Sequence, residues 1–141
     1  MITEDYVSFE TAKLLKEKGF DEELETVYSE YGELHRIFDK DLYESTNSFK
    51  SITNSHYNDI TKYKYDFFVT APTIQMAMKW LREVHNISVE PLVDFGSGDG
   101  YWWTADVGYI RKDGLIDELC GYNSYEEACE AAIKYCLENL I

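Results

Sequence analysis

The sequence predicts an α+β domain in which an antiparallel sheet, formed by a hairpin and a three-strand meander, carries about three helices on one face. Apolar residues recur with a helical period in three stretches and with a period of two in several others. The two kinds of stretch are grouped rather than strictly alternating, which is typical of α+β domains and not of parallel α/β sheets. With 141 residues, the chain is expected to form a single domain over residues 1–141.

The first helix is predicted over residues 9–18. Ser8 precedes it, and its hydroxyl can accept from the free N–H groups of the first turn. Gly19 follows it and can adopt the left-handed conformation that ends many helices. Phe20 is then expected to fold back on Leu15, as in a Schellman motif.

The next stretch, residues 21–33, is strongly acidic. The dipeptide Tyr31-Gly32 predicts a turn between strands at 26–30 and 33–38. Residues 39–61 are rich in Ser, Thr, Asn and Asp and predict an irregular segment, either a poor helix or a mobile excursion.

Residues 62–70 predict a strand, because their apolar side chains alternate. A second helix is predicted over residues 73–85, with Pro72 at its opening. Its inner face is expected to consist of apolar residues at helical spacing: Ile74, Ala77, Met78, Leu81 and Val84.

The C-terminal part reads as a meander followed by a helix. Strands are predicted over 87–95 and 101–109, with a third near 115–120 after the turn signal Asp113-Gly114. Pro91 marks the first of them as an edge strand or a bulge. A helix over residues 125–140 completes the chain, and its N-terminus has the capping-box pattern of Ser124 and Glu127.

The charge excludes several classes of partner. There are 27 Asp+Glu against 13 Lys+Arg, giving a net charge of −14. Direct nucleic-acid binding is not expected, because phosphate binding depends on clustered Lys and Arg. Binding to anionic membranes is disfavoured for the same reason, and no apolar run is long enough to span a bilayer. Three cysteines without paired spacing and the absence of a signal-peptide pattern predict a cytoplasmic protein.

A glycine-rich run, residues 93–100 (VDFGSGDG), resembles the first motif of class I S-adenosylmethionine-dependent methyltransferases. Too few residues follow Gly100 to build the sheet of that family, and the next segment has the pattern of a strand rather than of a helix. We therefore interpret the run as a hairpin loop and predict no cofactor. The three histidines lack partners at metal-ligand spacing, so no metal site is predicted either.

Two groups of residues are candidates for binding a partner. The aromatic cluster Tyr101, Trp102 and Trp103 is the densest in the chain, and exposed Trp and Tyr residues are common anchors of protein interfaces. The alternative is that these side chains belong to the core. The acidic residues of the second group are either a solvated surface or a surface for a basic partner: Asp21, Glu22, Glu23 and Glu25.

Most of the chain also resembles a group of small proteins from gut anaerobes and their phages that has no assigned activity. The resemblance is carried by residues 7–22 (VSFETAKLLKEKGFDE), 71–73 (APT), 79–87 (KWLREVHNI) and 121–128 (GYNSYEEA). It implies a phage or mobile-element origin and supplies no catalytic residues.

Together these observations predict a non-enzymatic protein-interaction module, with an inhibitor or a nucleic-acid mimic as special cases. The alternative is a small enzyme or a small-molecule-binding domain with a pocket between helix and sheet. Only a few polar residues are candidates for such a pocket: His85, Asp94, Asp99 and Tyr101.

Overall fold

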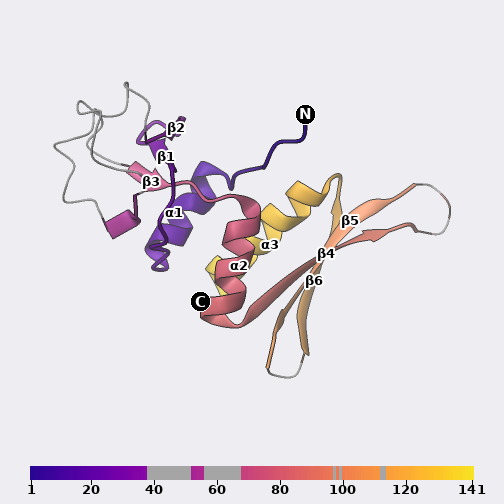
Figure 1. The fold of residues 1–141 in the computed structure, drawn as a ribbon. Coiled ribbons are helices and arrows are strands. Elements are labelled where there is room, and N and C mark those ends of the chain that lie inside the picture. The colour runs from indigo at the N-terminus through magenta and orange to yellow at the C-terminus, as the bar shows by residue number, and fades with distance from the viewer. Residues whose placement is uncertain (38–51, 56–67, 97, 99, 112–113) are drawn as a thin grey trace. The chain divides into compact units, whose positions relative to one another are not determined.

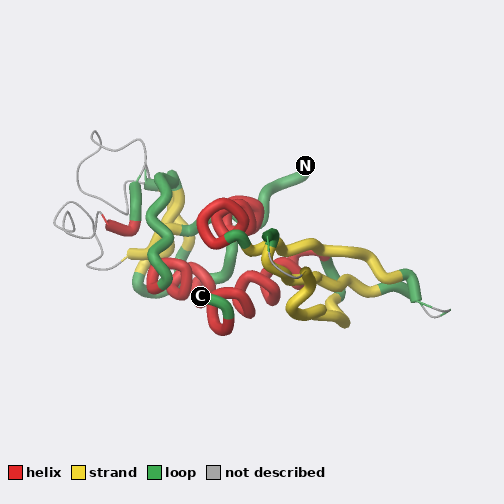
Figure 2. The backbone as a smooth tube through the Cα atoms, turned by 90° about the horizontal axis from the view of Figure 1, so that it is seen from below, coloured by secondary structure: helices red, strands yellow, loops and turns green. Residues whose placement is uncertain are grey.

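The computed structural model describes residues 1–37, 52–55, 68–96, 98, 100–111 and 114–141. Within these residues, three helices and six strands form an α+β structure, as predicted (Figure 1). All strand pairs are antiparallel, but the strands divide between two three-stranded sheets instead of forming the single sheet that we expected. Figure 2 shows the same elements from a second direction.

The described residues belong to two compact units. We call Tyr6–Pro72 the N-terminal unit, and Met1–Asp5 together with Thr73–Ile141 the C-terminal unit. The expectation of one domain over the whole chain stays a prediction.

Helix α1 of the N-terminal unit spans Phe9–Glu17 and has the predicted ends. The Ser8 hydroxyl accepts from the Thr11 backbone N–H at 3.2 Å. Gly19 is left-handed, with a φ of 91°, and the Phe20 N–H donates to the Leu15 carbonyl at 2.9 Å. This is the Schellman arrangement, and it turns the Phe20 side chain into the core.

The sheet of this unit has the order β2-β1-β3. Strands β1 (Thr26–Ser29) and β2 (Leu34–Arg36) form the predicted hairpin, in which Gly32 adopts a φ of 76°. Strand β3 (Phe68–Thr70) is the end of the predicted strand 62–70, and the residues before it lie outside the described ones. Phe38, the predicted end of the hairpin, also lies outside them.

Four residues of the predicted irregular segment 39–61 are described, and two of them, Ile52 and Asn54, are part of the core of the N-terminal unit. Ile52 is fully buried and exchanges two backbone hydrogen bonds with Leu24, at 2.8 and 2.9 Å. Asn54 is buried as well. The remaining buried apolar residues of this unit come from its helix, its strands and their flanks: Val7, Ala12, Leu15, Phe20, Val27, Ile37, Val69 and Ala71.

Helix α2 of the C-terminal unit spans Ile74–His85. Its N-cap is Thr73, whose hydroxyl accepts from the Met76 N–H, so Pro72 precedes the cap instead of occupying the first turn. Four of the five predicted inner positions are buried, but the fifth, Val84, is 54% exposed. Val84 lies in the last turn of α2.

The sheet of the C-terminal unit is a meander of order β4-β5-β6, so β4 and β6 are its edges. Strand β4 spans Ile87–Asp94, β5 spans Trp102–Tyr109 and β6 spans Gly114–Tyr122. Pro91 lies on β4 and therefore on an edge strand, as its missing N–H requires. The β5–β6 pairing contains two register shifts, one of them between Val107 and Gly108.

Helix α3 (Tyr125–Asn139) packs against all three strands of the meander, and α2 packs against β4 and α3. At the N-terminus of α3 the Ser124 hydroxyl accepts from the Glu127 N–H, as the capping-box prediction requires. The Glu127 carboxylate accepts from the Asn123 N–H rather than from the Ser124 N–H of a regular capping box, and both distances are 3.1 Å. One stripe of α3 is fully buried: Ala128, Cys129, Ala132, Ile133, Cys136 and Leu137. Among the described residues, no helix combines the length and the apolar character needed to cross a bilayer.

Candidate interaction surface

The two faces of the β4–β5–β6 meander differ in what covers them. On the inner face, Val89, Ala105 and Val107 are buried, in agreement with the packing of α3 against all three strands. Because successive side chains point to opposite faces, the alternate residues of each strand form an outer face. Leu92 and Trp102 of that outer face are 49% and 40% exposed, which marks it as the candidate surface.

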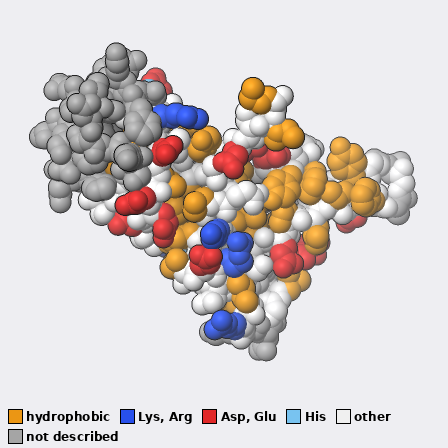
Figure 3. Space-filling view, in the orientation of Figure 1, with side chains coloured by type: hydrophobic (Ala, Val, Ile, Leu, Met, Phe, Trp, Pro, Cys, Tyr) orange, Lys and Arg blue, Asp and Glu red, His pale blue; other side chains and the backbone are white. Residues whose placement is uncertain are grey.

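Large apolar side chains gather at the end of the β4–β5 hairpin. Phe95 is 77% exposed and Tyr101 is 65% exposed, and they flank the turn that joins the two strands. Together with Leu92 and Trp102 they make up what we call the hairpin-tip patch. Figure 3 shows hydrophobic side chains along this hairpin up to the undescribed residues of its turn.

Local contacts hold the patch in place. The Asp94 carboxylate accepts from the Gly96 N–H at 2.9 Å, and Asp94 is paired with Trp102 across the strands. Gly96 is left-handed, with a φ of 58°, and a Cβ atom on it would lie 3.2 Å from the Trp102 ring. The indole of Trp102 therefore lies against the turn backbone, which holds this member of the patch in place.

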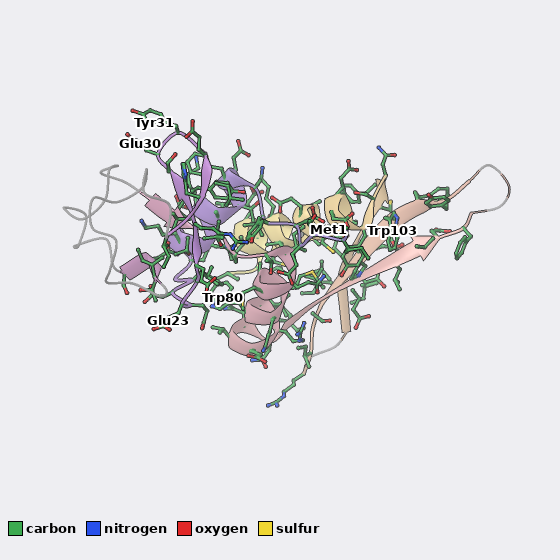
Figure 4. The ribbon with its side chains drawn as sticks, turned by 45° about the horizontal axis from the view of Figure 1, so that its top comes forward. Met1, Glu23, Glu30, Tyr31, Trp80 and Trp103 are labelled. Carbon is green, nitrogen blue, oxygen red and sulfur yellow. The ribbon has the colours of Figure 1, made fainter. Side chains whose placement is uncertain are left out.

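Trp103, the third member of the predicted aromatic cluster, lies on the inner face. Its side chain is half-buried, and its ring meets Tyr125 of α3 edge-on, with centroids 5.5 Å apart (Figure 4). Strand alternation thus separates Trp102, which is exposed, from Trp103, which packs against the helix, and Tyr101 precedes the strand and is exposed.

Three carboxylates form a line across the middle of the outer face. The strand register pairs Glu90 with Asp106 and Asp106 with Glu118. Side chains of directly paired residues lie on the same face, about 5 Å apart at their Cβ atoms. Glu90 and Glu118 are exposed and Asp106 is half-exposed. We call these three residues the carboxylate row.

A cavity of about 520 Å³ adjoins the carboxylate row. Its lining includes Glu90 and Asp106 of the row, Ser88 and Gly108 of the neighbouring strand positions, and Arg82 of α2. Gly108 cannot carry a side chain there, because a Cβ atom would lie 2.6 Å from the Gly114 carbonyl oxygen. Backbone and small side chains thus form part of the cavity wall.

The acidic candidates Asp21, Glu22, Glu23 and Glu25 belong to the N-terminal unit, and all four are exposed. Glu23 is labelled in Figure 4. Asp21 has a structural role, since its carboxylate accepts from the Ser55 N–H at 2.7 Å. The hairpin-tip patch and the carboxylate row belong to the other unit, so the acidic residues that accompany the exposed aromatics there are Glu90, Asp106 and Glu118.

The structure does not bring the candidates for a catalytic pocket together. His85, Asp94 and Tyr101 are absent from the lining of the 520 Å³ cavity, and Asp99 lies outside the described residues. Burial lowers the pKa of His85. Its Nε2 has no hydrogen-bond partner among the described residues, and the centroid of its ring lies 4.6 Å from that of Trp80. The three cysteines are free thiols, and burial raises the pKa of Cys129 to about 11 and that of Cys136 to about 12.

Within the described part of the chain, no group of three or more His, Cys, Asp or Glu residues is placed to hold a metal ion. Comparison of the whole chain with protein-family models, with curated proteins and with solved structures finds no significant match.

Proposed function

We propose that this protein is a protein-interaction module that binds its partner through the hairpin-tip patch. The observation that carries the proposal is the exposure of four large apolar side chains at the end of the β4–β5 hairpin. Leu92 and Trp102 lie on the paired strands, and Phe95 and Tyr101 lie in the segment that joins them. Scattered apolar residues are normal on protein surfaces, whereas a contiguous group with aromatic members is typical of binding sites.

The scaffold supports the same function. Aromatic anchors bind best when little conformational freedom is lost on association. Trp102 is held by its strand and by the Gly96 turn, so its ring needs no ordering when a partner covers it. Tyr and Trp also lose only two side-chain torsions each, which favours them as rigid contacts.

The test compares two pairs of substitutions with the same chemistry. Phe95→Ser with Tyr101→Ser removes the two most exposed members of the patch. Tyr31→Ser with Leu34→Ser removes exposed apolar side chains from the β1–β2 hairpin of the N-terminal unit. Each variant is used as bait in an extract of the source cells, and bound protein is quantified by mass spectrometry. We expect the first pair to reduce capture of a specific partner at least about tenfold, as loss of central interface residues does, and the second pair to leave it unchanged.

Equal capture by the Phe95/Tyr101 variant and the unmodified protein would contradict the proposal. A photo-crosslinking residue at position 101 gives an independent readout, because it should attach the partner covalently while the same residue at position 31 should not. A variant that had lost its fold would lose its circular dichroism signal, which separates unfolding from loss of the surface.

Further parts of the proposal concern location and origin. A cytoplasmic location is supported by the free thiols of Cys120, Cys129 and Cys136, which oxidising compartments would tend to oxidise. The net charge of −14 supports a protein as the partner rather than a nucleic acid or an anionic membrane, and leaves an inhibitor or nucleic-acid mimic as special cases. The phage or mobile-element origin depends on the sequence resemblance alone and stays a prediction.

The second candidate function is the binding of a small molecule, and the cavity beside the carboxylate row is the observation that favours it. Its lining has two carboxylates against the one guanidinium of Arg82, which favours an amine as the ligand, so a thermal-shift screen of mono- and polyamines tests it directly. Stabilisation that is saturable and lost in Glu90→Gln with Asp106→Asn would support this function. No stabilisation by any amine would leave the protein-interaction function as the better account.

A further inference from the structure

We propose that the partner presents an extended basic segment, whose Lys or Arg side chains lie over the carboxylate row while a neighbouring apolar side chain contacts the hairpin-tip patch. This inference depends on the proposed function and specifies the chemistry of the partner. It concerns the outer face of the meander, whose inner face is covered by α3.

The charge distribution of the meander carries the argument. Strands β4, β5 and β6 contain five acidic residues and no Lys or Arg. Three of the five, Glu90, Asp106 and Glu118, are direct cross-strand neighbours. Like charges that face each other across strands destabilise a sheet, so this arrangement lowers the stability of the free protein. A cationic partner would remove that repulsion on binding.

The spacing along β4 defines the partner further. Outer-face residues of one strand are two positions apart, which corresponds to about 7 Å. Leu92 is therefore about 7 Å from Glu90 along the strand, and the Asp94–Trp102 pair is about 13 Å away. An extended partner segment has the same spacing along its own chain. A basic and an apolar side chain on one face of that segment would therefore be two or four residues apart.

The 520 Å³ cavity provides space for the basic side chain itself. Gly108 and Ser88 make part of its wall small, and its charged lining residues are Glu90, Asp106 and Arg82, so two carboxylates stand against one guanidinium. Lys and Arg side chains combine an apolar stem with a charged end, and they bury the stem while the charge meets an acceptor. The cavity can thus take the stem while the carboxylate row takes the charge.

The same charges argue against other occupants of this face. A second copy of the chain would bring another carboxylate row against the first, and charge repulsion opposes such a contact. Nucleic acids and anionic lipid surfaces are repelled for the same reason. A basic protein segment is the occupant that complements the face in both charge and hydrophobicity.

The first test uses the complete protein and two synthetic peptides. One peptide has a leucine and two lysines at every second position, with serines between them and at both ends. The other has glutamates in place of the lysines. We expect only the lysine peptide to shift the NMR signals of β4, β5 and β6 amides at low salt, and we expect salt to weaken the effect. Equal shifts with the glutamate peptide, or shifts confined to the helices, would overturn the inference.

The second test locates the charge that the partner contacts. Glu90→Gln with Asp106→Asn and Glu118→Gln removes the carboxylate row, and Glu22→Gln with Glu23→Gln and Glu25→Gln removes the same charge from the N-terminal unit. Exposed ion pairs are individually weak, so we expect the first triple variant to bind the lysine peptide about tenfold more weakly. The second should bind as the unmodified protein does. Equal weakening in both would mean that only the total charge matters, which would also overturn the inference.

The stability of the variants excludes a trivial loss of fold. Removing like charges from facing positions should leave the thermal unfolding midpoint of the first triple variant unchanged or higher. The native partner then separates the two proposals. Capture that depends on Phe95 and Tyr101 but not on the carboxylate row would refute this inference alone, whereas capture that depends on neither would refute the proposed function.

Discussion

Asn54 connects three segments of the N-terminal unit through one buried side chain. Its amide nitrogen donates to the Phe20 carbonyl at 2.6 Å, and its amide oxygen accepts from the Thr70 N–H at 2.9 Å. Both partners are backbone groups that are close to helix α1 or strand β3, and neither can easily reach water. Asn is suited to this position because its side chain presents both a donor and an acceptor.

The first prediction concerns this residue. Asn54→Ala should lower the free energy of unfolding by roughly 2–4 kcal/mol, because two buried backbone groups lose their partner. Asn54→Asp should be at least as damaging, since the carboxylate would face the Phe20 carbonyl. Urea denaturation followed by circular dichroism measures both. Ser55→Ala is the matched control and should cost under about 0.5 kcal/mol, as most exposed substitutions do; equal loss in the control and in Asn54→Ala would contradict the assignment.

The buried thiols predict how stability changes at alkaline pH. Unfolded cysteines ionise near pH 8.5, whereas burial raises the pKa of Cys129 to about 11 and of Cys136 to about 12. Above about pH 8.5 the unfolded chain therefore binds fewer protons than the folded one, and stability falls as the pH rises toward these values.

Urea midpoints measured at a series of pH values test this expectation. Cys129→Ala with Cys136→Ala should be less stable at neutral pH, because cavities form, but its stability should decline less steeply with pH. Cys120→Ala, which alters the exposed thiol, should retain the steep decline. An unchanged slope in the double variant would show that other groups, such as Tyr125 and Tyr135, whose pKa values burial also raises, dominate.

At the scale of elements, the three helices were predictable because their signals are local. Ser8 and Ser124 cap helix ends as predicted, and Gly19 ends α1 in the left-handed conformation. Caps depend only on residues a few positions apart, and the sequence contains them all. Val84 was predicted to be buried and is exposed. Periodicity predicts which residues share a face of a helix, but it does not predict how much of that face other elements cover.

The candidate surface was predictable only in part. The sequence pointed to Tyr101 and Trp102, which are exposed, and to Trp103, which the sheet turns toward α3. It missed Phe95, because the predicted strand 87–95 included this residue among the alternating apolar side chains of the strand. The strand ends at Asp94, and Phe95 follows it. The carboxylate row was missed because it depends on the register of two strand pairs. Bulges and turns set that register, and their positions do not follow from the residue types alone.

The next prediction tests the β5–β6 pairing. Gly108 has no positive φ, yet a Cβ atom there would lie 2.6 Å from the Gly114 carbonyl oxygen. Gly108→Ala should therefore lower the free energy of unfolding by about 2–3 kcal/mol, because the two strands must separate.

Gly121→Ala serves as its control. Gly121 has a φ of 88° with open space around it, so the substitution introduces backbone strain without a clash and should cost about 1 kcal/mol. Thermal unfolding of both variants gives the comparison. A Gly108→Ala protein as stable as the unmodified one would show that the strands are not so closely paired.

At the scale of the whole molecule, the fold class followed from the grouping of helical and strand patterns, but the division into two sheets did not. Strand β1 pairs with β3 across an interval of about forty residues, and Leu24 pairs with Ile52 across a segment that carries no clear pattern. Pairings between distant segments depend on tertiary packing, whereas propensity and periodicity describe neighbours. The hairpin 26–38 and the meander were therefore predictable as local motifs, and their separation was not.

The edges of the meander have a consequence for solution behaviour. Open strand edges invite pairing with other chains, and Pro91 on β4 and an inward-facing charge on β6 are two devices that prevent it. That charge is Asp117, which is paired with Val107 and lies on the inner face. Burial raises the pKa of Tyr135, and the Asp117 carboxylate raises it further.

Asp117→Val should remove this protection and produce larger species in sedimentation velocity runs. Glu138→Val, which replaces a carboxylate by the same apolar side chain at an exposed position of α3, should sediment as the unmodified protein does. Equal behaviour of the two variants would contradict the expectation. Acidification toward the isoelectric point of about 4.5 should act in the same direction, since it reduces the net negative charge that keeps the molecules apart. The acidic character of the sheet would thus serve colloidal stability as well as recognition: it would keep a three-stranded sheet with two open edges from growing into fibres.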